Sequence, residues 1–248
     1  MGTFDTAARC RQLAAQPPRW TPGEGFGYHA ETQGYLLGEL VRRVDGRTLG
    51  AFFRDEVAQP LGLDLHIGLD KHHDDRVADV STLRAEPSIP PEPELARLEQ
   101  ISSARSAALV NTRAWRRAEL PASNAHGNAR SLALAMAPLA NEGRLGEERL
   151  LSPETIDRTF EVQAEGVDRM SGRRFKLGIG YGLHCKHTPL GVNDRTLWWA
   201  GWGGSMCVID VENRLTVCYA MNRMLGEGDM RAPGVIFAAH AAAARLRG

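Results

Sequence analysis

The chain has 248 residues, a length that fits one large domain or two small ones. Its 30 Lys and Arg residues balance its 30 Asp and Glu residues, and this zero net charge argues against binding to nucleic acid or to an anionic membrane. Hydrophobic residues make up 43% and charged residues 24%, which is typical of a packed globular chain. No apolar run approaches the ~20 residues of a membrane span, so we expect a soluble, cytoplasmic protein.

Helices are predicted in the first part of the chain. A loop at 19–27, rich in Gly and Pro, precedes an apolar repeat that predicts a helix over 30–44. Gly46 stands where a left-handed cap would end this helix. Thr48 is a suitable N-cap for a second helix, which Pro60 would stop.

A proline-rich stretch with charged residues, 70–95, predicts a surface loop. The helices on either side of it fit one core, so we interpret residues 1–248 as a single domain. Beyond the loop, 129–141 has a helical pattern and Ser152 caps a short helix. The chain closes with an Ala-rich helix predicted over 235–246.

The last hundred residues switch to the alternating pattern of strands. We predict three strands, at 177–184, 205–211 and 215–222. The last two are joined by a turn at 211–214, and a loop of even length places Cys207 opposite Cys218. Helices, antiparallel strands and a closing helix together predict an α+β fold with an antiparallel sheet flanked by helices.

Metal and redox centres are not expected. The four cysteines lack CxxC spacing, which argues against a zinc cage or a redox dithiol and favours reduced thiols. The run His72-His73-Asp74-Asp75 and the separate His126 do not have ligand spacing, so a solvated loop is the better interpretation. No glycine motif for phosphate or dinucleotide binding is present. We therefore expect neither a metal nor a cofactor.

A nucleophilic serine motif is absent from the sequence. No Gly-x-Ser-x-Gly elbow occurs, and none of the ten serines has a lysine three residues later. Ser81, Ser102 and Ser171 have arginine at that position, and a guanidinium cannot lose a proton to become a base.

Two other segments carry candidate chemistry. Tyr28 stands just before the first helix and could transfer a proton, although a tyrosine of this kind is more often a packing residue. The glycine-rich run from Trp198 to Ser205 could offer an N–H to an oxyanion, and the alternative is a kinked strand filled by aromatic core residues.

Blocks of sequence along nearly the whole chain occur in one characteristic order. They include Trp20-Thr21-Pro22-Gly23, Gly27-Tyr28-His29-Ala30, Pro60-Leu61-Gly62-Leu63-Asp64, Asn124-Ala125-His126-Gly127-Asn128 and Gly201-Trp202-Gly203-Gly204-Ser205. In this order they resemble the serine beta-lactamase-like family, in its class C and carboxylesterase branch. The resemblance implies a partial beta-lactamase/transpeptidase-like fold, because the family's N-terminal strands and Ser-x-x-Lys helix have no match here.

The resemblance also implies roles for individual residues. Tyr28 matches the family's general base, and Ala30 stands where beta-lactamases have Asn. Trp199-Ala200-Gly201 matches the esterase form of the family's strand motif, which implies that Trp199, Gly201 and the N–H of Trp202 bind the substrate and its oxyanion. A one-residue offset would use Trp198 instead. Both substitutions favour ester cleavage over beta-lactam hydrolysis.

Three functions follow from these expectations. The first is the C-terminal part of a serine hydrolase that acts on a small-molecule ester or amide through an acyl-enzyme, and that is inactive as this chain alone. The second is a pseudoenzyme that binds an acyl or glycan ligand without turnover. The third is one half of a two-piece hydrolase whose separately encoded N-terminal segment supplies the serine and the lysine.

Overall fold

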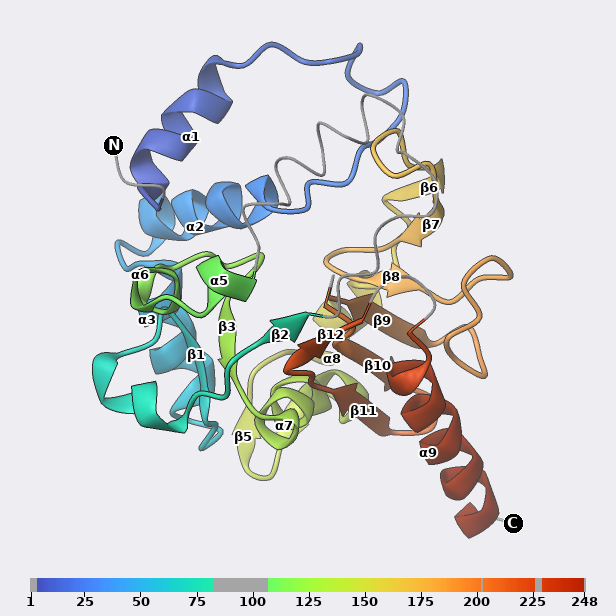
Figure 1. Ribbon diagram of the computed structural model, residues 1–248. Coiled ribbons are helices and arrows are strands. Elements are labelled where there is room, and N and C mark those ends of the chain that lie inside the picture. Colours follow the sequence, from blue (N-terminus) through green and yellow to red (C-terminus); the bar gives the residue numbers. More distant parts are fainter. Residues whose placement is uncertain (1–3, 83–106, 202, 226–228, 248) are drawn as a thin grey trace.

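A six-stranded antiparallel sheet forms the C-terminal part of the computed structural model, which describes residues 4–82, 107–201, 203–225 and 229–247 (Figure 1). The order is β11-β10-β9-β8-β7-β6, so each strand pairs with the next one in the sequence. The strands are β6 Ala164–Val167, β7 Arg174–Leu177, β8 Gly182–Leu183, β9 Thr196–Ala200, β10 Met206–Asp210 and β11 Leu215–Tyr219. The predicted α+β class with an antiparallel sheet is confirmed.

The hairpin of β10 and β11 has the predicted register. Its turn closes where the N–H of Arg214 donates to the carbonyl of Val211 at 3.3 Å, and Arg214 takes a φ of 53°. Cys207 lies opposite Cys218, as expected for a loop of even length. On the other side of β10, Cys207 lies opposite Trp199 of β9. Because directly opposed residues share a face, these three side chains form one row across three strands.

The predicted strand at 177–184 is wrong, because the structure divides it between β7 and β8. The N–H of Gly178 donates to the carbonyl of Tyr181 at 2.9 Å, and Gly180 has a φ of +82°. Leu177 then pairs with Gly182 across the resulting hairpin. A Cβ on Gly178 would come within 2.0 Å of the carbonyl oxygen of Thr159, so only glycine allows this approach of the two backbones.

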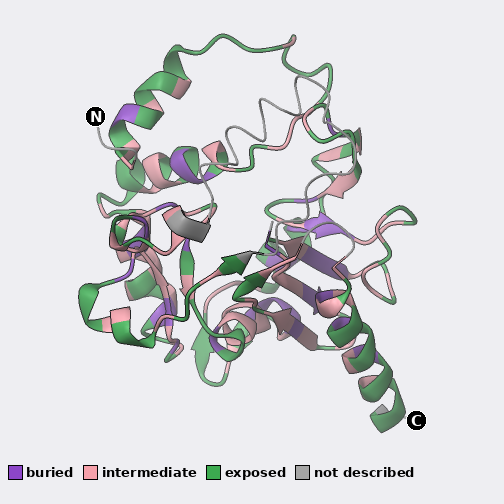
Figure 2. Cartoon of the chain, viewed as in Figure 1, coloured by how far each residue is buried: buried purple, intermediate pink, exposed green. Residues whose placement is uncertain are grey.

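Two helices cover opposite faces of the sheet. Helix α7, Ala129–Ala140, packs on the face that carries Leu197, and helix α9, Arg231–Arg247, places Ile236 on the face that carries Trp198. Successive residues of a strand point to opposite faces, which is why one strand serves both cores. Figure 2 shows buried positions in the sheet and on these helices, and further buried positions in the N-terminal half.

The helix ends agree closely with the sequence analysis. Helix α2 covers Thr32–Val44, and Gly46 beyond it has the left-handed φ of +90°. Thr48 caps α3, since its side chain accepts from the N–H of Ala51. The closing helix α9 begins at Arg231, four residues before the predicted start at Val235.

The remaining elements are short and lie mainly in the N-terminal half. The helices are α1 Thr6–Ala15, α3 Leu49–Phe53, α5 Ala107–Val110, α6 Arg113–Arg117 and α8 Pro153–Arg158, and a π-helical turn η1, Arg54–Ala58, continues α3. The strands pair as β1 Leu65–Ile67 with β3 Ala125–Gly127, β2 Ser81–Thr82 with β12 Arg223–Met224, and β4 Arg144–Leu145 with β5 Glu148–Arg149.

The predicted loop at 70–95 contains regular structure where the chain is described. A 3-10 helix η2, Lys71–Arg76, covers the two adjacent histidines, and β2 pairs with β12 in parallel. Residues 83–95 lie outside the described residues. The single-domain interpretation of residues 1–248 stays a prediction.

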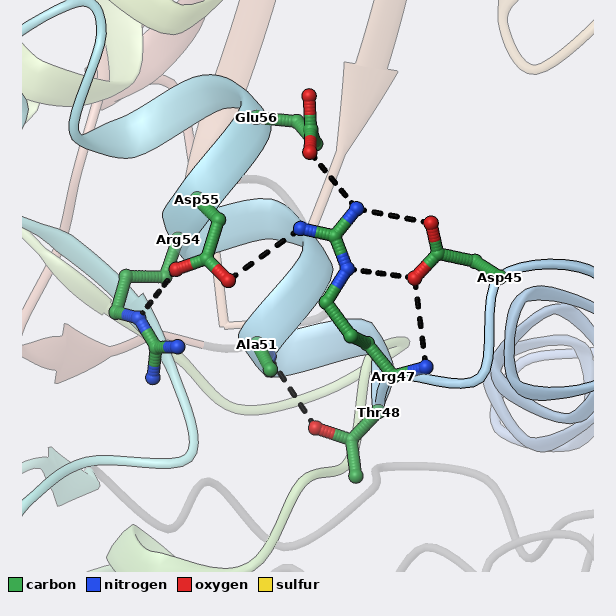
Figure 3. Close-up of polar contacts among 7 residues, drawn as sticks. All are labelled: Asp45, Arg47, Thr48, Ala51, Arg54, Asp55 and Glu56. Atoms are coloured by element: carbon green, nitrogen blue, oxygen red, sulfur yellow. Dashed lines mark hydrogen bonds and ion pairs between the residues drawn. The ribbon is translucent and has the colours of Figure 1, made fainter.

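An ion cluster joins the turn after α2 to η1 (Figure 3). The guanidinium of Arg47 contacts the carboxylates of Asp45 at 2.6 Å, Glu56 at 2.7 Å and Asp55 at 3.3 Å. These carboxylates raise the pKa of Arg47, and hydrogen bonds from Arg47 lower the pKa of Asp45. The cluster holds the corner after α2, the helix that follows the Tyr28 loop.

Candidate active site

Tyr28 and Trp199, two of the residues predicted for the site, are in contact. Tyr28 belongs to the loop that precedes α2, and Trp199 belongs to β9 near the centre of the sheet. Their ring centroids lie 5.5 Å apart with an interplanar angle of 57°. Both side chains are half-buried. Offset or tilted aromatic pairs at this separation attract one another, so the contact ties the N-terminal loop to the sheet.

A buried carboxylate positions Tyr28. Asp168, which directly follows β6, is fully buried, and its Oδ1 accepts the backbone N–H of Tyr28 at 2.6 Å. Its Oδ2 accepts both the N–H of Ser171, at 2.7 Å, and the Ser171 hydroxyl. A buried carboxylate needs such donors to offset its lost hydration. Asp168 therefore connects the turn after β6 with the backbone of the candidate base.

The sequence analysis did not single out Asp168. The run Asp168-Arg169-Met170-Ser171-Gly172 carries a turn signal, because Asp and Ser side chains accept and donate within turns. That signal indicates the local hydrogen bonds. Nothing in it points to Tyr28, which lies 140 residues away in sequence.

The glycines of the Tyr28 loop allow it to dock on this turn. Arg169 donates its N–H to the carbonyl of Phe26 at 3.1 Å, and its guanidinium lies 5.1 Å from the centroid of the Trp20 ring. A Cβ on Gly25 would lie 2.7 Å from the Arg169 side chain, and one on Gly27 would lie 2.6 Å from the Trp20 ring. A side chain at Gly25 would displace the Arg169 side chain, and one at Gly27 would displace the Trp20 ring.

Trp198 and Trp199 have different environments. Trp198 is 6% exposed, donates its indole N–H to the carbonyl of Leu183 at 3.2 Å and stacks on Phe175. It is thus a core residue on the α9 side of the sheet. The Trp199 ring stacks beside the Trp198 ring, with 5.9 Å between centroids, and it is also the ring that meets Tyr28. This geometry favours the alignment on Trp199 over the one-residue offset that uses Trp198.

Gly201 directly follows β9, and its own backbone groups are engaged. Its N–H donates to the carbonyl of Ser205 at 2.7 Å, and its carbonyl accepts the N–H of Gly204 at 3.0 Å. The Gly201 N–H is therefore not free to hold an oxyanion in this conformation. Trp202, the predicted oxyanion donor, lies outside the described residues.

Two serines near these segments bond to a backbone N–H or to a carboxylate of a turn. Ser205 accepts the N–H of Met221 at 3.2 Å, and the exposed Ser171 bonds to Asp168 within its own turn. In the described part of the chain, neither hydroxyl contacts a lysine or a histidine. A carboxylate is a weak base toward a serine hydroxyl, so Ser171 is a turn residue and not an activated nucleophile.

Three of the histidines lie at a separate cleft. This cleft, with a volume of about 860 Å³, is lined by charged and imidazole side chains that include Lys71, His66, His72, His73, Arg113 and Glu119. None of its lining residues belongs to the predicted site.

Among the described residues, no group of three or more His, Cys, Asp or Glu side chains could hold a metal ion. None of the described helices has the length and apolar content needed to cross a membrane.

The fold and the motif positions define a protein of the beta-lactamase class. The Beta-lactamase family model matches residues 2–241, and the chain therefore belongs to this family. The resemblance predicted from the sequence is confirmed by this match. The same fold occurs in two solved structures, a penicillin-binding protein homolog from Caulobacter crescentus and a family VIII carboxylesterase.

These similarities extend over nearly the whole chain but over only part of each relative. The Caulobacter protein is 37% identical with a TM-score of 0.85, and the carboxylesterase is 35% identical with a TM-score of 0.84. Each match covers 96% of this chain and 64% of the other. Esterase/beta-lactamase LipL from Mycobacterium tuberculosis is 29% identical over 232 residues, which are 86% of this chain and 52% of LipL. The chain thus spans about half the length of this curated relative.

Proposed function

We propose that this chain forms one wall of an ester-cleaving pocket in a serine hydrolase. The observation that carries the proposal is the contact between Tyr28 and Trp199, which brings the two sequence motifs of the candidate site together. Two relatives are named as esterases or carboxylesterases, which supports an ester as the substrate class. Because the 248 residues contain no Ser-x-x-Lys, the attacking serine and its lysine come from a segment outside this sequence.

In this mechanism, Tyr28 takes the proton from the attacking serine. The serine oxygen forms a bond to the ester carbonyl carbon, and the carbonyl oxygen becomes an oxyanion. The N–H of Trp202 donates to that oxyanion, a role that the N–H of Gly201 cannot take while it is bonded to Ser205. Tyr28 then returns the proton to the leaving alcohol, and water releases the acid from the acyl-enzyme by the same steps.

The decisive experiment adds the missing motif. One sample contains the chain alone. The other contains the chain co-expressed with the N-terminal portion of the family VIII carboxylesterase, the portion that has no counterpart in this chain. Both samples are assayed with p-nitrophenyl esters and with a fluorophosphonate probe. We expect no labelling or turnover from the chain alone, and both from the combined sample. Tyr28→Phe in the combined sample should lower turnover by about 10²–10⁴.

A matched control uses another tyrosine. Tyr181→Phe removes a hydroxyl whose hydrogen-bond partner among the described residues is the sulfur of Met136, at 3.7 Å, and should leave turnover near that of the unchanged sample. Labelling of the chain alone would contradict the requirement for an external serine. A combined sample that folds and is labelled, but whose turnover is insensitive to Tyr28→Phe, would contradict the role of Tyr28.

A second candidate is a pseudoenzyme that binds an acyl or glycan ligand. The observation that favours it is the absence of Ser-x-x-Lys from the sequence. Saturable binding of an intact ester to the chain alone, with no turnover in the combined sample, would support this function. Hydrolysis by the combined sample would rule it out as the main function.

A further inference from the structure

Two cysteines that do not belong to a CxxC motif are in contact in the sheet. Cys207 of β10 lies directly opposite Cys218 of β11, and the Cys218 thiol donates to Cys207 Sγ at 2.8 Å. All four cysteines are free thiols, and Cys10 contacts instead the carbonyl of Tyr35 at 3.4 Å. The strand pairing thus creates a thiol pair that spacing along the sequence does not show.

The backbone hydrogen bonds around β10 show that Cys207 and Cys218 occupy the kind of antiparallel pair in which the two side chains are closest. The carbonyl of Ser205 accepts from Gly201, and the N–H of Val211 donates to Arg195, so the residues on either side of β10 direct these backbone groups toward the flanks of β9. The N–H and carbonyl groups of successive residues in a strand point to opposite neighbouring strands. Cys207 lies an even number of residues from both Ser205 and Val211, so its N–H and carbonyl also point to β9. Toward β11 it therefore forms a non-hydrogen-bonded pair, in which the Cα atoms are about 4.5 Å apart. Disulfides form at Cα separations of about 4.4–6.8 Å.

We propose that Cys207 and Cys218 form a reversible disulfide, which makes this pair an oxidation site in the same row of side chains as Trp199. Both cysteines are half-buried, so a small oxidant can reach them. The site does not depend on the proposed ester hydrolysis. Its place beside Trp199 means that closing the disulfide changes the packing under the Tyr28–Trp199 contact.

A low-molecular-weight disulfide such as oxidised glutathione is the chemical class of oxidant. The Cys207 thiolate attacks one sulfur of this reagent, the reagent's S–S bond breaks, and one glutathione thiolate leaves. Cys218 then loses its proton to solvent and attacks Cys207 Sγ, which releases the second glutathione. Two protein thiols are oxidised and one reagent disulfide is reduced to two thiols. The hydrogen bond to Cys207 and burial raise the pKa of Cys218, so this second step should be faster at alkaline pH.

The test counts thiols in the folded chain. After incubation with oxidised glutathione at about pH 8 and alkylation in denaturant, we expect the four reactive thiols to fall to two. Peptide mapping should find the link between residues 207 and 218, and dithiothreitol should restore four thiols. The double variant Cys10→Ser/Cys185→Ser should lose both of its thiols. The variant Cys218→Ser should retain a glutathione adduct on Cys207, because the resolving thiol is missing.

Three results would overturn the proposal. The first is a folded chain that keeps all four thiols under conditions that oxidise a reference dithiol. The second is a link that joins two molecules, seen as a dimer on a non-reducing gel. The third is loss of two thiols that persists in the Cys207→Ser/Cys218→Ser variant, because it would assign the oxidation to the other two cysteines.

Discussion

The backbone N–H of Tyr28 donates to the buried carboxylate of Asp168 at 2.6 Å, across 140 residues of sequence. The same carboxylate holds the turn after β6 through Ser171. The loop that carries the candidate base therefore depends on a residue in the outer hairpin of the six-stranded sheet. In the proposed mechanism Asp168 is therefore a positioning residue, because it holds the backbone of Tyr28.

Asp168→Ala should free the Tyr28 loop. The change leaves the N–H of Tyr28 and the Ser171 turn without their acceptor, and we expect the free energy of unfolding to fall by about 1–3 kcal/mol. Urea unfolding measures this loss, and hydrogen exchange should show faster exchange of the Tyr28 amide. Asp194→Asn, at an exposed carboxylate, is the matched control and should change stability by less than about 0.5 kcal/mol. An unchanged exchange rate at Tyr28 would contradict the positioning role.

The contact between Tyr28 and Trp199 should appear as a coupling energy. In a double-mutant cycle of Tyr28→Ala and Trp199→Ala, we expect the two single losses to differ from the double loss by about 0.5–1.5 kcal/mol. Equilibrium unfolding of the four proteins gives this value. A parallel cycle of Tyr28→Ala with Trp115→Phe, in a separate core cluster, should be additive. Additivity in the first cycle would show that the rings do not interact.

Two helix glycines should respond to alanine in opposite directions. Gly34 in α2 faces Ala122, whose backbone nitrogen would be 2.5 Å from an added Cβ, whereas Gly234 in α9 has nothing within 4 Å of that position. We expect Gly34→Ala to lower the free energy of unfolding by about 1–3 kcal/mol through overpacking. Gly234→Ala should raise it by about 0.5–1 kcal/mol through helix propensity. Thermal melts of both variants test the pair, and stabilisation by Gly34→Ala would contradict the close packing of α2.

Glu39 on α2 should stay ionised in acid. Arg42 donates to its carboxylate at 2.8 Å and Arg43 at 2.7 Å, and these hydrogen bonds lower the pKa of Glu39 to about 2. Since the pKa is depressed in the folded state, the stabilisation is present above the ordinary value of about 4.3 and is lost as pH falls toward about 2. Carboxyl carbon shifts in an NMR titration measure the midpoint. The variant Arg42→Gln/Arg43→Gln should move it back toward the ordinary value, and a normal midpoint in the unchanged chain would contradict the two ion pairs.

Local chemistry was enough to predict the helix ends and the last hairpin. Thr48 and Ser152 cap helices through their own hydroxyls, and each contact spans only three residues. The register of Cys207 against Cys218 follows from the length of one turn. Such features depend on neighbours in the chain, so the order of residues determines them directly.

Three features of the fold depend on contacts between segments that are distant in the sequence, and sequence patterns did not determine them. The division of 177–184 into two strands depends on the close approach of Gly178 to Thr159, and an alternating pattern cannot report a contact with another element. The choice of Trp199 over Trp198 depends on which of the two rings contacts Tyr28, because Trp198 belongs to a core cluster. The contact between Asp168 and Tyr28 depends on the packing of the turn after β6 against the Tyr28 loop, because a hydrogen bond between distant segments exists only in the folded chain.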